Sequence, residues 1–241
     1  MNKVELFIFD MDGLLFDTGR LAYQAYVRSA EKHNYEMTHN VYYYLTGQTE
    51  ADIQRDMQEL YGSDAPIAEW RASTNGFKNE LLEQSQRVYK KKGVMDILNF
   101  ARDKGIRVAL ASSNVEERIY KYLDMEGIRD YFEIIVTGDE VKQGKPDPEI
   151  FLTACSKAGM APRQAVVFED SAAGVEAARR AGITSFLIED NINDLPIRLG
   201  RGRYRLLKDL SQVREKPAPA DYQFHDLTQA KNYLEAKELY L

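Results

Sequence analysis

The fold is decided by the stretch Phe7-Ile8-Phe9-Asp10-Met11-Asp12-Gly13, an apolar run that ends in two acids and a glycine. The run begins at Val4 and is nearly unbroken, which is typical of a strand buried on both faces of a parallel sheet. Asp10 and Asp12 therefore lie beyond the carboxyl end of that strand, where ligands bind in open α/β sheets. Two ionised carboxylates this close repel each other, so the pair needs a cation, a shared proton or full solvation. A hard divalent metal ion meets that need, and the alternative is a solvated turn of residues that favour turns.

Strands and helices alternate over the second half of the chain. The other predicted strands cover 106–111, 131–136, 165–168 and 184–188, and helical patterns separate them. This order is typical of a doubly wound α/β fold with a parallel sheet, whose right-handed crossovers bring the carboxyl ends of the strands to one edge. A last short strand and a helix are predicted over 221–241.

Residues 18–88 have a helical pattern with few strand signals. We therefore predict an α/β core domain of residues 1–17 and 89–241, with a small helical domain of residues 18–88 inserted into it. The aromatic side chains of the insertion either form the core of a helix bundle, which is their commoner role, or line a substrate pocket; they are Tyr23, Tyr26, Tyr35, Tyr42, Tyr43, Tyr44 and Trp70. The loop from Thr46 to Glu50 either reaches toward a site or simply caps the next helix through Thr49.

Composition bears on the partners and the compartment of the protein. The 241 residues are 44% hydrophobic and carry a net charge of −6, which argues against nucleic acid as the main partner. Cys155 is the single cysteine, so an internal disulfide is impossible. This cysteine count is compatible with a protein of a reducing compartment. No apolar run approaches the roughly 18 residues of a membrane span, and the first strand begins too early to leave room for a signal segment. We expect a cytoplasmic protein without a membrane partner, either a monomer or a weak dimer.

A run of basic residues lies near the end of the chain: Arg198, Arg201, Arg203, Arg205 and Lys208. The run could contact an acidic partner or a phosphorylated ligand. A solvated face is the commoner role of such a run, and we favour it here.

Polar residues gather where the predicted strands end. They are Asp10, Asp12, Ser112, Ser113, Asn114, Lys145, Glu169 and Asp170. Phosphoryl transfer needs a nucleophile, cationic and hydrogen-bonding cover for the phosphoryl oxygens, and an acid for the leaving group, and this set supplies all three. Carboxylate oxygens as the only ligands favour Mg²⁺ over softer metals.

Four motifs in this set resemble those of the haloacid-dehalogenase-like hydrolases, in the branch that has a helical cap and includes the β-phosphoglucomutase-like phosphatases. The motifs are Asp10-Met11-Asp12-Gly13, Ser112 after an apolar strand, Lys145 in Gly-Lys-Pro-Asp-Pro, and Glu169-Asp170-Ser171. They occur in order, and the resemblance covers essentially the whole chain.

The resemblance implies that Asp10 forms an aspartyl-phosphate and that Asp12 is the general acid and base. Ser112 and Lys145 would hold the phosphoryl group, with help from Ser113 and Asn114. Mg²⁺ would be held by Asp10, Glu169, Asp170 and the backbone carbonyl of Asp12. Residues 18–88 would then be a cap that hinges near 17–19 and 91–93 and selects the substrate through Gly47, Gln48, Thr49 and Glu50.

Departures from the branch bear on the reaction. The sugar-phosphate mutases have a histidine where this chain has Ala22, and a cap arginine for a second phosphate where this chain has Glu50. Both changes favour a plain phosphatase over a mutase. Asp12 argues against a dehalogenase, and no lysine is identified for phosphonate hydrolysis.

The leading hypothesis is therefore a Mg²⁺-dependent phosphatase that hydrolyses a small phosphorylated metabolite, either a sugar phosphate or a nucleotide. The alternatives are a β-phosphoglucomutase-type phosphosugar mutase and a non-catalytic phosphate-binding or regulatory protein.

Overall fold

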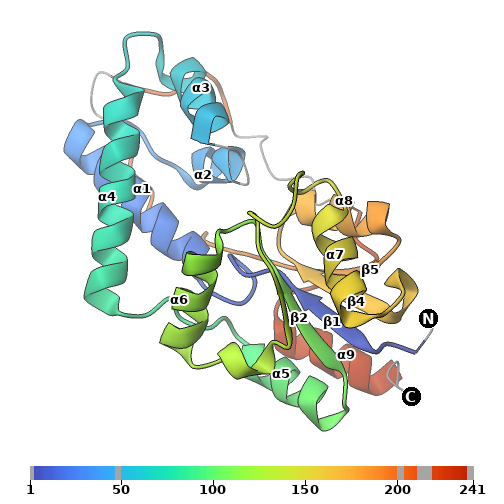
Figure 1. Cartoon of the computed structure of the whole chain (residues 1–241). Helices are drawn as coiled ribbons and strands as arrows, with labels where there is room; N and C mark the ends of the chain where they lie inside the picture. The colour runs from blue at the N-terminus through green and yellow to red at the C-terminus, as the bar shows by residue number, and fades with distance from the viewer. Residues whose placement is uncertain (1–2, 47–49, 200–203, 211–218, 238–241) are drawn as a thin grey trace. The chain divides into compact units, whose positions relative to one another are not determined.

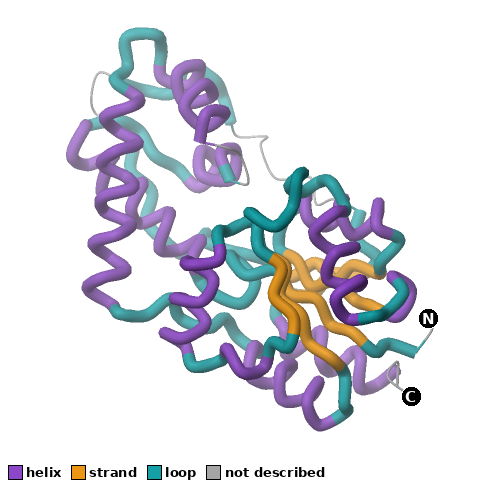
Figure 2. The backbone as a smooth tube through the Cα atoms, viewed as in Figure 1, coloured by secondary structure: helices purple, strands orange, loops and turns teal. Residues whose placement is uncertain are grey.

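The computed structural model describes residues 3–46, 50–199, 204–210 and 219–237. The chain divides into two compact units. The sheet unit contains residues 1–17, 87–190 and 217–241, and the helical unit contains residues 18–86 and 191–216. Figure 2 shows the strands together in one part of the chain, while the other part consists of helices and loops.

The sheet unit contains a six-stranded parallel sheet with the order β3-β2-β1-β4-β5-β6. The strands are β1 (Leu6–Phe9), β2 (Arg107–Ala111), β3 (Ile134–Val136), β4 (Ala165–Glu169), β5 (Thr184–Ile188) and β6 (Tyr222–Phe224). The predicted doubly wound parallel sheet is confirmed. The third strand begins later than predicted because residues Arg129–Tyr131 form a 3₁₀ turn, named η1.

Helices cover both faces of the sheet (Figure 1). On one face, Phe7 packs on Phe100 of α5 and Phe186 packs on Tyr233 of α9. On the other face, Leu6 and Ile8 share a buried apolar cluster with α7 and α8. The helices are α5 (Val94–Asp103), α6 (Glu116–Glu126), α7 (Glu149–Ala158), α8 (Ala172–Ala181) and α9 (Leu227–Lys237), with a second 3₁₀ turn η2 (Pro162–Gln164). The apolar residues of β1 are therefore buried on both sides, as its unbroken pattern predicts.

The last residue of α6 fixes the segment that enters the sheet unit at residue 87. The buried carboxylate of Glu126 accepts hydrogen bonds from the Arg87 side chain at 2.7 and 2.8 Å and from Lys90 Nζ at 3.0 Å. The backbone N–H groups of Val88 and Tyr89 donate to the same carboxylate at 3.2 and 3.1 Å. Burial would raise the pKa of Glu126, but these donors outweigh burial and lower that pKa to about 2.

The helical unit is built around aromatic side chains. Its helices are α1 (Thr18–His33), α2 (His39–Leu45), α3 (Glu50–Tyr61) and α4 (Ile67–Ser85). Trp70 is 1% exposed and stacks on Tyr35 with ring centroids 4.1 Å apart. Tyr61 and Tyr204 meet the edges of the same indole. Most of the aromatic residues in the insertion therefore form its core, the commoner of the two predicted roles.

The described residues 191–199 and 204–210 group with the helical unit, whereas their sequence pattern predicted that they belong to the α/β core domain. Met37 and Arg198 exchange two backbone hydrogen bonds of 2.8 Å, and Ile192 and Leu210 enter the aromatic cluster. This grouping could not be predicted because the segment has little periodicity and its apolar residues are widely spaced.

Two of the five basic residues near the end of the chain pair with acids of the helical unit. Lys208 lies 2.6 Å from Glu59, and Arg198 lies 4.0 Å from Glu31. Both pairs favour the solvated-face interpretation, while Arg201 and Arg203 lie outside the described residues. Among the described residues, no helix is long and apolar enough to cross a membrane.

Candidate active site

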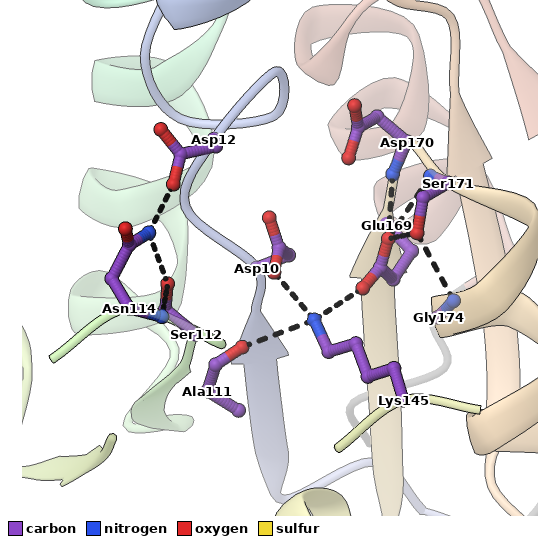
Figure 3. Close-up of polar contacts among 10 residues, drawn as sticks. All are labelled: Asp10, Asp12, Ala111, Ser112, Asn114, Lys145, Glu169, Asp170, Ser171 and Gly174. Carbon is purple, nitrogen blue, oxygen red and sulfur yellow. Dashed lines mark hydrogen bonds and ion pairs between the residues drawn. The ribbon is translucent and has the colours of Figure 1, made fainter. Parts of the chain in front are cut away.

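The candidate site lies where β1 meets β2 and β4 at the carboxyl edge of the sheet. Phe9 pairs with Leu110 on one side and with Phe168 on the other, so Asp10 comes level with Ala111 and Glu169. The chain leaves β1 for β2 and later returns on its other side to form β4, which makes this the point where open α/β sheets bind ligands. Figure 3 shows the predicted residues from these separate strands facing one another.

Lys145 occupies the centre of the site (Figure 3). Its Nζ donates to a carboxylate oxygen of Asp10 and to one of Glu169, and it lies 3.3 Å from the carbonyl oxygen of Ala111. The lysine side chain is 7% exposed, and those of Asp10 and Glu169 are 12% and 0% exposed. Burial would lower the pKa of Lys145, but the two carboxylates outweigh it and raise that pKa, so the side chain carries a positive charge.

One lysine does not balance the negative charge of the site. Burial, together with the charge of Glu169, raises the pKa of Asp10 to about 7 although Lys145 opposes the rise. Burial and the charges of Glu169 and Asp10 also raise the pKa of Asp170 well above its usual value. Oxygen atoms of these three acids lie within 4.8 Å of one another. An all-carboxylate set of this kind fits Mg²⁺, whose preferred protein ligands are oxygen atoms.

Glu169 is held in place by the start of α8. One of its carboxylate oxygens accepts hydrogen bonds from the N–H groups of Asp170 and Ser171 at 3.1 and 3.0 Å, and from the Ser171 hydroxyl at 2.9 Å. Ser171 also caps α8 by accepting from the N–H of Gly174 at 3.0 Å. A Cβ atom on Gly174 would overlap the carboxylate of Glu169. Gly174 was not predicted from the sequence, where its only signal is its place three residues after a capping serine.

Asp12 belongs to a separate hydrogen-bonded group (Figure 3). Its carboxylate accepts a hydrogen bond from Asn114 Nδ2, which also lies 3.1 Å from the Ser112 hydroxyl oxygen. Ser112 is 1% exposed and Asp12 is half-buried, whereas Ser113 is exposed beside them. Asp10 and Asp12 therefore have different partners, so each carboxylate can have a different role.

Gly13 makes the turn after Asp12 possible. Its φ of +78° lies in the left-handed region, and its N–H donates to the carbonyl oxygen of Phe16 at 3.0 Å. A Cβ atom here would overlap the carboxylate of Asp170 and come within 3.1 Å of an oxygen of Asp190. Asp190 in turn accepts a hydrogen bond from Lys91 Nζ at 2.5 Å. This ion pair beside the acidic cluster was missed, because Lys91 lies in a run of three lysines that predicts only a polar surface.

One of the four predicted substrate-selecting residues, Glu50, lies within the described residues. Gly47, Gln48 and Thr49 lie outside the described residues, and Glu50 begins α3 in the helical unit. The Glu50 carboxylate accepts hydrogen bonds from Arg71 Nε and Nη2 at 2.9 and 2.7 Å. The pairing gives Glu50 a partner within the helical unit, and the role of Glu50 in selecting a substrate stays a prediction. Arg71 was not predicted as a site residue, since an arginine inside a predicted helix usually lies on its solvated face.

Comparison with known proteins agrees with this geometry. The family model described as "Haloacid dehalogenase-like hydrolase" matches residues 7–188. A phosphorylated carbohydrates phosphatase from Thermotoga maritima is 35% identical over 211 residues, which cover 85% of this chain and 94% of that relative. A beta-phosphoglucomutase from Bacillus subtilis is 28% identical over 187 residues, covering 73% of this chain and 79% of that relative.

A solved structure has the same fold. The HAD family hydrolase from Deinococcus radiodurans R1, crystallised with bound phosphate and sodium, aligns with a TM-score of 0.76 and 20% identity. The alignment covers 99% of this chain and 98% of that one. The family model spans more than half of the chain and includes all four motifs of the site. The chain therefore belongs to the haloacid dehalogenase-like hydrolases, in the branch of the β-phosphoglucomutase-like phosphatases.

Proposed function

We propose that the protein is a Mg²⁺-dependent phosphatase that hydrolyses a small sugar phosphate through an aspartyl-phosphate on Asp10. The observation that carries the proposal is the position of Lys145 Nζ, which bridges Asp10 and Glu169 beside Asp170. This arrangement puts a nucleophilic carboxylate next to a fixed cation and a set of metal-binding oxygens. The name of the Thermotoga maritima relative, a phosphatase of phosphorylated carbohydrates, supports the substrate class.

In the first half of the reaction, a carboxylate oxygen of Asp10 attacks phosphorus as the bond to the sugar oxygen breaks. The leaving oxygen takes a proton from Asp12, and the sugar departs as a neutral alcohol. In the second half, Asp12 accepts a proton from water as that water attacks the aspartyl-phosphate. Inorganic phosphate leaves and Asp10 is regenerated. Asn114 orients Asp12 for both transfers through its hydrogen bond to the carboxylate.

The phosphoryl oxygens need donors on the protein side. Lys145 supplies the cation, and the hydroxyl of Ser112 supplies a neutral donor, with Ser113 and Asn114 close by in the same loop. Bound Mg²⁺ would neutralise charge on the transferring phosphoryl group. Its ligands would be carboxylate oxygens of Asp10, Asp170 and Glu169 together with the backbone carbonyl of Asp12. We further propose that the helical unit selects the leaving group.

Two alternatives make different predictions. A phosphosugar mutase, the activity in the name of the Bacillus subtilis relative, would convert a hexose 1-phosphate to the 6-phosphate in the presence of catalytic bisphosphate. It would do so without releasing stoichiometric inorganic phosphate. A non-catalytic phosphate-binding protein would release none from any ester. The chain contains a complete set of nucleophile, acid, cation and metal ligands, which argues against the non-catalytic alternative.

The test is phosphate release from hexose phosphates with Mg²⁺, by the wild type and by Asp10→Asn. We expect release by the wild type, and a loss of about 10³-fold or more in the variant because the amide is not a competent nucleophile. Asp103→Asn is the matched control, since this exposed aspartate ends α5 in the same unit. Undiminished release by Asp10→Asn would overturn the mechanism.

A further inference from the structure

A fourth acid, Asp190, lies beside the three that are proposed to hold the metal ion. It follows β5, which runs parallel to β4 with Leu187 level with Glu169. The carboxyl ends of parallel strands lie at the same edge of a sheet, so Asp190 reaches the edge that carries Glu169 and Asp170. All of these residues belong to the sheet unit. The Asp190 side chain is 15% exposed, so water screens its charge only in part.

Asp170 and Asp190 approach each other over the turn at Gly13. A Cβ atom on Gly13 would overlap Oδ2 of Asp170 and would lie 3.1 Å from Oδ2 of Asp190. Burial is the largest cause of the raised pKa of Asp170, while the charge of Asp190 adds to the rise and that of Lys91 opposes it. The charges of Asp190 and Lys91 therefore act, with opposite signs, on a proposed ligand of the metal ion.

Lys91 holds Asp190 in this position. Its Nζ donates to Oδ1 of Asp190 at 2.5 Å and lies 3.4 Å from the carbonyl oxygen of Glu189. The backbone N–H of Lys91 donates to the carbonyl oxygen of Leu15 at 2.9 Å, which ties Lys91 to the turn that contains Gly13. The Lys91 side chain is 17% exposed, unlike a freely solvated surface lysine. Because Lys91 engages Oδ1, the other oxygen of Asp190 stays on the side of Asp170.

The pair of Lys91 and Asp190 adds no net charge to the site. Three acids and Lys145 leave two negative charges when all are ionised, which one divalent cation balances. Loss of Asp190 alone would leave the site one negative charge short of that balance. Loss of Lys91 alone would add one negative charge to it. The two losses should therefore change the affinity for a divalent cation in opposite directions.

Asp190 is placed to support the ion and not to bind it directly. In the described part of the chain, the acids whose oxygens lie within 4.8 Å of one another are Asp10, Glu169 and Asp170. Mg²⁺ keeps several water molecules when carboxylates bind it, and groups next to the direct ligands orient the site and tune its affinity.

We propose that Asp190 is a positioning residue that acts on Mg²⁺ through a metal-bound water, and that Lys91 holds Asp190 and limits the metal affinity. The proposal rests on the proposed phosphatase function and adds to it the pair of residues that sets how tightly the ion is bound.

The experiment is a calorimetric titration with Mg²⁺ of the wild type, Asp190→Asn and Lys91→Met at pH 8. We expect Asp190→Asn to bind Mg²⁺ about tenfold or more weakly, because a negative charge and an acceptor for water are lost. Lys91→Met should bind Mg²⁺ about threefold or more tightly, because a positive charge beside the site is lost. A purely structural pair would weaken binding in both variants, so the opposite signs distinguish the two roles.

The matched control is the neighbouring pair of Lys92 and Asp226. Its Nζ and Oδ2 atoms are 2.9 Å apart, and the Asp226 side chain is 14% exposed, close to the value for Asp190. Asp226→Asn and Lys92→Met should keep the Mg²⁺ affinity within about twofold of the wild type. In phosphate release, Asp190→Asn should need more Mg²⁺ for half of its maximal rate, while its kcat at saturating Mg²⁺ stays within about twofold.

The outcomes separate this proposal from the proposed function. Wild-type affinity in Asp190→Asn, or weaker binding in both Asp190→Asn and Lys91→Met, would overturn the role of the pair. If Asp190→Asn folds poorly, Lys91→Met still decides, since unchanged or weaker binding by that variant would also overturn it. A wild type that binds no Mg²⁺ in the titration would instead refute the proposed function.

Discussion

Replacing Lys145 by methionine tests the charge balance of the site. The lysine side chain is 7% exposed and its two carboxylate partners are 12% and 0% exposed, so the variant leaves buried acids without their cation. Removing one partner of a buried ion pair costs about 3–5 kcal/mol in the free energy of unfolding. Asp10 limits that loss, because its pKa is already about 7 and rises further without the lysine, so the carboxyl can take up a proton.

The sign of the pH dependence follows from this proton uptake. A carboxyl group with a raised pKa in the folded state contributes stability that is present at low pH and is lost as the pH rises through that pKa. We therefore expect Lys145→Met to lose about 3 kcal/mol at pH 8 and less at pH 6, measured by urea unfolding without Mg²⁺. With Mg²⁺ present, kcat/KM should fall by about 10²–10³-fold, since a donor to the transferring phosphoryl group is lost.

The matched control is Lys157→Met. Lys157 pairs with a single acid, Glu140, and the two side chains are 40% and 39% exposed. A surface pair of this kind contributes at most about 1 kcal/mol, and no change in activity is expected. If Lys145→Met kept both the stability and the activity of the wild type, the account of Lys145 as the central cation would be refuted.

Three other perturbations give expected outcomes of different kinds. Gly13→Ala places a Cβ against the Asp170 carboxylate, so we expect Mg²⁺ binding measured by calorimetry to weaken about tenfold or more. Gly105→Ala is the control, because Gly105 also has a positive φ but faces open space. The control should only lower the free energy of unfolding, by about 1 kcal/mol. The pKa of Asp10 is about 7, so protons compete with Mg²⁺ for its carboxylate below that pH. The Mg²⁺ affinity should therefore fall by up to about tenfold per pH unit below 7. Equal affinities at pH 6 and pH 8 would contradict this expectation. The pKa of Glu126 is about 2 in the folded protein, against an ordinary value of 4.5. The difference corresponds to about 3 kcal/mol in the free energy of unfolding, which is present above pH 4.5 and is lost as the pH falls toward 2. The urea midpoint of the wild type should therefore approach that of Glu126→Gln between pH 5 and 3, and a constant difference would argue against this role for the carboxylate.

The sequence predicted the sheet and the residues that gather at its edge, for a physical reason. Parallel strands joined by right-handed crossovers have their carboxyl ends on one side, so any polar residue just past a strand reaches that side. The need for a positive charge beside Asp10 was also expected from the sequence, and Lys145 supplies one. The structure adds that the two acids have separate partners, Lys145 and Asn114.

What the sequence did not predict depends on contacts between distant segments. Glu126 and the residues it binds lie 36 to 39 positions apart, and no periodicity links them. Arg71 and Glu50 lie on different helices, so their pairing requires the packing of the helical unit to be known. Local patterns report which face of an element is buried, and they do not report which charged side chains meet across two elements.

Asp10 is the residue that carries the phosphoryl group in the proposed mechanism. The most direct measurement is mass spectrometry of the Asp12→Asn variant, quenched in acid after mixing with p-nitrophenyl phosphate and Mg²⁺. Because this variant lacks the base that activates water, we expect one equivalent of nitrophenolate per enzyme and one phosphoryl group on the peptide that contains Asp10. A phosphoryl group on any other residue, or the same burst from a variant that also carries Asp10→Asn, would contradict the mechanism.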